Sequence, residues 1–248
     1  MKKVIVLLLT IWLGTGVEAL LITTADGNGA DGWISNDNQS SSYWSNTVHN
    51  TTGMQARYNG GGSRFRATFM RFDISSVSGP IAADAKLQLG QTFTKGSDKV
   101  MHVYGLVDGD AGELWSETTL CYDNAPGFLT PPEGNNLGYY AIDPARLILL
   151  GTFIIPGLGS SSGTTLTPPV TILTHPATLP LADFLNADTN GLVTFVLINA
   201  AGTSSNNSEN RFASKEDANG GWPTLVIVPE PATLVLLGLG GLLLSRKR

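Results

Sequence analysis

The sequence predicts an all-β fold, a jelly-roll-like β-sandwich flanked by an N-terminal signal helix and a C-terminal hydrophobic helix. Its 29 glycines, with many Ser, Thr and Asn residues, cluster between short apolar stretches, as is typical of strands joined by turns. Several of these stretches alternate apolar and polar side chains with a period of two, and long helical periodicity is absent from the body of the chain. Apolar runs stand at both ends.

The clearest strand pattern lies in Thr68–Ile74. Met70 and Phe72 face one way along such a strand, and Phe69 and Arg71 face the other way. Related patterns predict strands at Ala85–Leu89, Lys99–Val107, Leu192–Ile198 and Trp222–Val228, of which Leu192–Ile198 is apolar on both faces.

One helix and two loops complete the body. Leu179–Ala187 begins with a proline in its first turn and places Leu181 and Phe184 on one face, which predicts a short helix. Gly127–Gly138 and Gly157–Pro169 are rich in Gly, Pro, Ser and Thr, and both are predicted to be loops.

Residues 1–19 have the three parts of a secretory signal peptide. Lys2 and Lys3 precede the apolar run Val4–Leu13, and small residues around Ala19 predict cleavage after that residue. The alternative is an uncleaved membrane anchor, for which the apolar run is short compared with ~30 Å of hydrocarbon.

Residues 228–248 form a second distinct segment. The triplet Pro229, Glu230, Pro231 precedes the thirteen uncharged residues Ala232–Leu244. A helix of that length spans about 20 Å, which is short for a membrane crossing and suits a temporary anchor. The basic stop Arg246, Lys247, Arg248 favours a cytoplasmic position for this end.

The triplet, the apolar run and the basic stop together resemble a PEP-CTERM sorting signal. That family implies a Gram-negative bacterium that makes exopolysaccharide, and processing by an exosortase, a membrane-embedded cysteine transpeptidase. The resemblance implies a protein held transiently in the inner membrane and then found at the cell surface or outside the cell. The alternative is a hydrophobic helix that packs inside the domain.

The body carries a second resemblance, which runs from about Thr23 to Val228. Its ordered pieces resemble the DNRLRE-type domain, a secreted jelly roll akin to a carbohydrate-binding module. These pieces are Phe69–Ser75, Ile81–Leu89, Trp115–Thr119, Asn124–Pro126, Phe212–Glu216 and Pro223–Ile227. We therefore expect one β-sandwich domain over residues 20–227.

The charge of this body limits its partners. The whole chain has a net charge of −5, and the two end segments contribute +3 of it, which leaves −8 for the exported part. An acidic surface argues against nucleic acid and is compatible with neutral glycans, or with acidic glycans bridged by a cation.

The sequence predicts no catalytic residue. The histidines His49, His102 and His175 lie far apart without a zinc-binding pattern. Gly159–Gly163 matches G-x-S-x-G, but the residues that follow cannot begin a good helix. Cys121, the single cysteine, has no recognisable base beside it and is predicted to be a small buried side chain.

Charged pairs near the strands have a structural interpretation. Arg71 and Asp73 share one side of a strand, and Lys215 and Glu216 precede the last strand. We expect them to form ion pairs that close the sandwich, rather than a catalytic pair of carboxylates.

Two acidic, glycine-rich stretches are candidate calcium sites. Asp26, Asn28 and Asp31 place oxygen ligands on a flexible loop, which hard cations favour, and Asp108–Glu113 does likewise. The alternative for both is a solvated turn that uses Asp and Gly for their backbone preferences.

Aromatic residues are the candidates for glycan binding, because ring faces stack on the C–H surfaces of sugars. Trp33, Tyr43 and Trp44 lie together in a polar N-terminal region, whereas Trp115 and Trp222 are expected to pack in the sandwich or at its rim.

The sequence therefore predicts an exported, non-catalytic surface or extracellular-matrix protein, sorted by exosortase and associated with exopolysaccharide. The alternatives are a cation-dependent carbohydrate-binding module, a glycan-active enzyme, and an adhesion domain without a small ligand.

Overall fold

Antiparallel strands dominate the residues that the computed structural model describes, which are 18–35, 38–39, 42–43, 48–49, 53–58, 65–129, 142–157, 162–175, 179–200 and 208–228. The strands are β1 (Leu20–Thr23), β2 (Ala30–Ser35), β3 (Asn38–Gln39), β4 (Ser42–Tyr43), β5 (Gly53–Tyr58), β6 (Phe65–Asp73), β7 (Lys86–Thr94), β8 (Lys99–Leu106), β9 (Leu147–Ile155), β10 (Thr164–His175), β11 (Leu192–Asn199), β12 (Ser208–Ala213) and β13 (Thr224–Ile227). One helix, α1 (Leu179–Ala187), and a short 3-10 turn, Tyr122–Asn124, accompany them.

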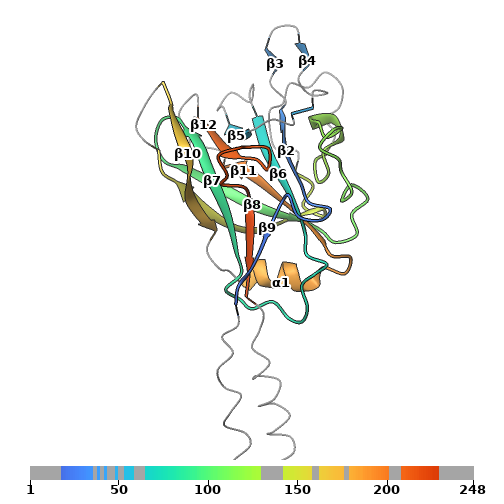
Figure 1. Cartoon of the computed structure of the whole chain (residues 1–248). Coiled ribbons are helices and arrows are strands. Elements are labelled where there is room, and N and C mark those ends of the chain that lie inside the picture. The colour runs from blue at the N-terminus through green and yellow to red at the C-terminus, as the bar shows by residue number, and fades with distance from the viewer. Residues whose placement is uncertain are drawn as a thin grey trace, which may run out of the picture.

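Eleven of these strands form one curled sheet (Figure 1). Its order is β1-β13-β7-β12-β5-β6-β11-β8-β9, with β10 added beside β7 and β2 beside β6. All of its strand pairs are antiparallel. The all-β prediction is therefore confirmed, whereas the closed two-layer sandwich or jelly roll stays a prediction. Both flanking helices lie outside the described residues.

The middle of the sheet is buried on both faces because β6 and β11 are apolar on both sides. On β6, Met70 and Phe72 enter the core inside the curl, whereas Phe69 enters a second apolar cluster on the other face. On β11, Phe195 and Val196 divide in the same way. The alternation predicted for β6 and the two apolar faces predicted for β11 are confirmed.

The second apolar cluster is covered by the long connection between β8 and β9. Trp115, Leu120, Tyr122 and Phe128 pack from this connection against Phe69 and its neighbours. The edge-on contact of Trp115 with Phe69, with ring centroids 5.9 Å apart, anchors the connection. The position of this connection brings Glu117 to the start of β2, where it contacts Asp31.

The helix α1 has the predicted bounds, and its Phe184 packs edge-on against Phe195 with ring centroids 5.6 Å apart. The loop predicted at Gly157–Pro169 is wrong in its second half, because β10 begins at Thr164 and pairs with β7. The two prolines fall where this ladder shifts register, between Thr165 and Val170, so they remove no regular ladder hydrogen bond.

The first and last strands lie side by side, and their outer ends share one end of the molecule (Figure 1). Leu20 opposes Ile227 in this ladder. Ala19, the predicted signal cleavage residue, is exposed directly before β1. Over the described part of the chain, no helix has the length and apolar character needed to span a membrane.

Candidate functional sites at two carboxylate clusters

The first cluster is built on β2, whose six residues are all buried. Asp31 lies in this strand and is fully buried. Its Oδ2 accepts hydrogen bonds from the Thr24 hydroxyl at 2.5 Å and from the backbone N–H of Lys215 at 2.9 Å. This one carboxylate therefore joins the first turn of the domain to the connection between β12 and β13.

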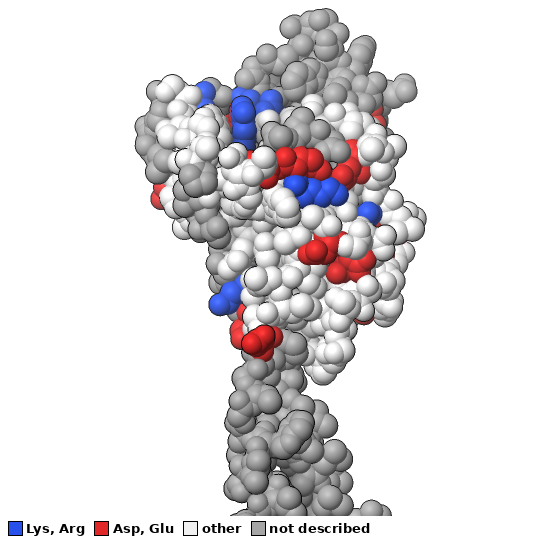
Figure 2. All heavy atoms as spheres, in the orientation of Figure 1, with Lys and Arg blue, Asp and Glu red and all other residues white. Residues whose placement is uncertain are grey.

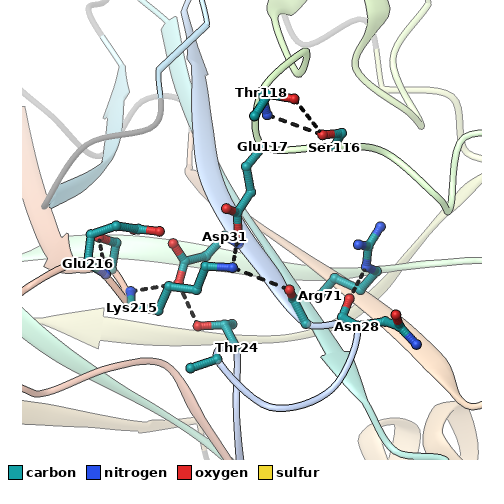
Figure 3. A network of polar contacts seen from close by, with 12 residues as sticks. Thr24, Asn28, Asp31, Arg71, Ser116, Glu117, Thr118, Lys215 and Glu216 are labelled. Atoms are coloured by element: carbon teal, nitrogen blue, oxygen red, sulfur yellow. Dashed lines mark hydrogen bonds and ion pairs between the residues drawn. The ribbon is translucent and has the colours of Figure 1, made fainter.

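Glu117 reaches the same place from the β8–β9 connection (Figure 3). Its Oε1 accepts the backbone N–H of Asp31 at 2.8 Å and forms an ion pair with Lys215 Nζ. Lys215 Nζ also lies 3.4 Å from the carbonyl oxygen of Gly29. Glu216 completes the group, since one carboxylate oxygen each from Asp31, Glu117 and Glu216 lie within 4.8 Å of one another.

Burial dominates the electrostatics of Asp31. It raises the pKa of this carboxyl to about 7, although the hydrogen bonds from Thr24 and Lys215 favour the charged form, and the charges of Glu216 and Glu117 raise the pKa further. Asp31 Oδ1 is buried and has no hydrogen-bond partner among the described residues. A buried carboxylate oxygen without a partner is costly, so this oxygen is the least satisfied atom of the cluster.

Arg71 borders this cluster and holds the surrounding loops together. Its guanidinium lies over the Trp115 ring, 5.2 Å from the centroid. The guanidinium donates to the backbone carbonyls of Asn28, Glu113 and Trp115. Arg71 thus bonds carbonyls where an ion pair with Asp73 was expected, and Lys215 pairs with Glu117 where Glu216 was expected.

The second carboxylate cluster contains Asp108, Glu113 and Asp188. One carboxylate oxygen from each residue lies within 4.8 Å of the other two. Burial raises the pKa of Glu113 and of Asp188, and the charge of Asp108 raises both further. Asp110, from the same predicted acidic stretch, turns away and binds Arg146 through two hydrogen bonds, of 2.6 Å to Nε and 2.7 Å to Nη2.

A cavity of about 380 Å³ adjoins this second cluster, with a mostly apolar wall that includes Leu106, Leu150, Phe184 and Val193. Its acidic edge is held by side-chain hydrogen bonds. Asn190 donates to Glu113 at 2.5 Å, and Thr189 donates to Asp108 at 2.6 Å. These contacts fix the α1–β11 turn against the end of β8.

The three predicted calcium ligands separate in the structure. Asp26 accepts the backbone N–H and the hydroxyl of Thr23, and the backbone N–H and side chain of Asn28 both donate to Asp73. Asp31 joins Glu117 and Glu216 instead. Sequence spacing missed this grouping because its members are 86 and 185 positions from Asp31 in the chain.

Of the three predicted glycan-binding aromatics, Trp33 is the one whose side chain the structure describes. It does not lie on an open surface. Trp33 is 4% exposed and stacks on His49 with ring centroids 3.8 Å apart. The side chain of Tyr43 and the whole of Trp44 lie outside the described residues.

Trp222, which was expected to pack in the sandwich or at its rim, is 38% exposed, more than the other tryptophans of the described chain. It lines a hollow of about 300 Å³, and its indole N–H donates to the Asp217 carbonyl at 2.9 Å. Gly90 and Gly221 form part of the lining, and a Cβ on Gly90 would lie 2.5 Å from the Gly221 carbonyl oxygen. The polar lining residues are Thr23, Gln88 and Thr224.

Of the remaining predicted residues, some are described by the structure and others lie outside the described part of the chain. Cys121 is buried and unpaired, as expected. Acidic and basic side chains meet on the face shown in Figure 2, amid a largely uncharged surface. The sorting triplet Pro229, Glu230, Pro231 and the basic stop Arg246, Lys247, Arg248 lie outside the described residues. So do the first three residues of the Gly159–Gly163 motif.

Comparison with known proteins assigns one segment of the chain to a known family. No curated protein matches the sequence. The resemblance of the body to the DNRLRE-type domain stays a prediction. Residues 228–248 match the family described as the PEP-CTERM protein-sorting motif, which supports an exported protein of the exosortase-substrate class.

Proposed function

We propose that this chain is a non-catalytic surface or extracellular-matrix protein that is processed by exosortase and associates with exopolysaccharide. The observation that carries the proposal is the sorting motif at residues 228–248. The motif begins directly after β13, so it includes none of the described strands.

The arrangement of the strand ends supports this processing. Ala19 precedes β1, Val228 follows β13, and the two strands pair along their whole length. Cleavage near Ala19 and near the Pro-Glu-Pro triplet would therefore occur at one end of the domain. Neither cut would remove a residue of the eleven-stranded sheet.

Mass spectrometry of the protein recovered from producing cells and from their medium tests the sorting step. We expect mature protein without residues 232–248, and full-length protein when Pro229, Glu230 and Pro231 are all replaced by Ala. Thr233→Ala, which leaves the triplet intact, is the control and should be processed. An intact C-terminus in the mature wild-type pool contradicts the proposal.

A carbohydrate-binding module is the second candidate, favoured by the hollow at Trp222. An exposed ring beside amide and hydroxyl groups is the combination that binds a sugar, because the ring stacks while the polar groups fix hydroxyls. The hollow is shallow, which suits one or two units of a longer chain.

Affinity electrophoresis of the full chain on a panel of polysaccharides tests this candidate. Retardation should persist in Trp222→Phe, which keeps a ring, and be lost in Trp222→Ala. Leu21→Ala, another exposed apolar truncation, is the control and should behave like the wild type. If Trp222→Ala is retarded as strongly as Trp222→Phe and the wild type, the hollow is not the binding site. Release of sugar products would indicate an enzyme.

A further inference from the structure

We propose that Asp31, Glu117 and Glu216 form a calcium site that ties three distant segments of the chain together. The proposal goes beyond sorting and does not depend on it. The segments are β2, the β8–β9 connection and the turn between β12 and β13.

The spacing of the oxygens fits one ion. Calcium binds oxygen ligands at about 2.3–2.6 Å, so two ligands of one ion lie at most about 5 Å apart. One oxygen from each of Asp31, Glu117 and Glu216 meets this limit, with all three within 4.8 Å of one another. Figure 3 shows the carboxylates of Asp31, Glu117 and Glu216 gathered around the same place.

A separate observation concerns Asp31 alone. Its side chain is fully buried, and Oδ1 lacks a hydrogen-bond partner among the described residues, although Oδ2 has two. Native proteins seldom leave such an atom unsatisfied. A bound cation would satisfy it without any change in the other contacts of Asp31.

The carboxylates of this cluster outnumber its cations, which favours binding of a divalent ion. Three carboxylates share the ammonium of Lys215, which pairs with Glu117. The contacts of Glu117 to Asp31 and Lys215 both use Oε1, which leaves Oε2 for a metal ion. Glu216 is exposed, so it offers a path for the ion from solvent.

The second cluster is a weaker candidate on the same criteria. Glu113 is buried, but its Oε2 accepts a hydrogen bond from Asn190. Asp188 has an oxygen without a partner in the described chain, but the residue is partly exposed. This cluster is therefore the internal comparison for the test.

Thermal unfolding of the full chain, with chelator and then with 1–10 mM calcium chloride or magnesium chloride, tests the site. Extracellular calcium modules bind in the range of about 10⁻⁴–10⁻³ M. At ten times the Kd, the expected rise in Tm is about 3–6 °C. Magnesium should give a smaller rise, because it demands a tighter octahedral set of ligands.

Variants assign the effect to this cluster. Glu216→Gln changes an exposed side chain, so the fold should persist while the calcium affinity falls at least about tenfold. Asp31→Asn should abolish the calcium-dependent shift. Lys215→Gln should tighten calcium binding, because it removes the competing ammonium. Asp84→Asn, which removes an exposed carboxylate from the β6–β7 connection, should leave the shift unchanged.

Two results would overturn the proposal. One is a folded wild-type chain whose Tm does not respond to calcium. The other is a response that survives in Glu216→Gln and Asp31→Asn but disappears in Glu113→Gln, which would move the site to the second cluster.

Discussion

Asp110 and Arg146 form the best-defined ion pair of the described chain. Arg146 donates two hydrogen bonds to a carboxylate whose side chain is 5% exposed, and these bonds lower the pKa of Asp110. Asp110→Asn should therefore reduce the free energy of unfolding by about 1–2 kcal/mol at pH 7, a range that allows for the partial exposure of Arg146. Urea unfolding of the full chain measures this difference.

The same pair predicts a pH dependence. Because the pKa of Asp110 is lower in the folded state than its ordinary value of 3.8, the stabilisation is complete above about pH 4 and is lost as the pH falls through the folded pKa. The gap between wild type and Asp110→Asn should be the same at pH 7 and pH 5 and shrink below pH 4. A gap that stays constant down to pH 2 would show that charge is not its cause.

Residue types alone predicted part of the polar chemistry. Asp31 was marked as a cation ligand from its glycine-rich surroundings, and it does belong to an acidic cluster. Its partners could not be predicted, because Glu117 and Glu216 meet it only after β2, the β8–β9 connection and the β12–β13 turn have folded together. Trp33 is buried although it was a candidate for glycan binding, because burial depends on the register of the strands and not on local composition.

The strand β11 supplies the core with a large buried aromatic side chain. Its Phe195 is fully buried between Phe72 and Phe184, with ring centroids 5.7 and 5.6 Å away. Phe195→Ala should lower the free energy of unfolding by about 3–5 kcal/mol, from lost burial and the cavity left behind. Ile154→Ala, on β9 at 61% exposure, should cost less than about 1 kcal/mol in the same denaturation experiment.

The turn between α1 and β11 depends on Gly191. This residue has a φ of +81°, and a Cβ there would lie 2.9 Å from the Ser75 Cα. Gly191→Ala should therefore cost more than the roughly 1 kcal/mol expected from backbone strain alone. Gly79 has the same φ with nothing within 4 Å of a Cβ, so Gly79→Ala is the matched control. Equal losses in Tm would exclude the contact with Ser75 as a cause.

Elements with strong periodicity were the predictable ones. The alternation in β6 and the leucine-rich face of α1 come from local patterns, and both elements were predicted from these. The strand β2 was missed because Asp31 and Gly32 resemble a polar loop, although tertiary contacts bury the whole strand. The strand β10 was missed because Pro168 and Pro169 indicate a loop unless their place at a register shift is known.

At the scale of the whole molecule, the pairing of β1 with β13 makes a direct prediction. Leu21 opposes Val226 in this ladder. Antiparallel partners lie about 4.5–5.5 Å apart at Cα, which suits a disulfide. The double variant Leu21→Cys/Val226→Cys should therefore oxidise to a cross-linked form with altered mobility on a non-reducing gel.

The offset pair Leu21→Cys/Thr224→Cys is the control, because its cysteines are diagonal neighbours about 7–8 Å apart. It should cross-link far less. Cys121 is buried and should not compete. Equal cross-linking of both pairs would mean that the register of β1 on β13 is not fixed.

This ladder also governs how the mature protein would be presented. If the chain is cut near Ala19 and near the Pro-Glu-Pro triplet, the two new chain ends lie beside each other, at the outer ends of β1 and β13. The hairpin of β3 and β4 lies at the opposite end of the molecule in Figure 1 and would point away from the two chain ends. Because β1 is the edge strand of the sheet and pairs with β13 alone, a pull on both chain ends would separate this ladder pair by pair, starting at Leu20 and Ile227.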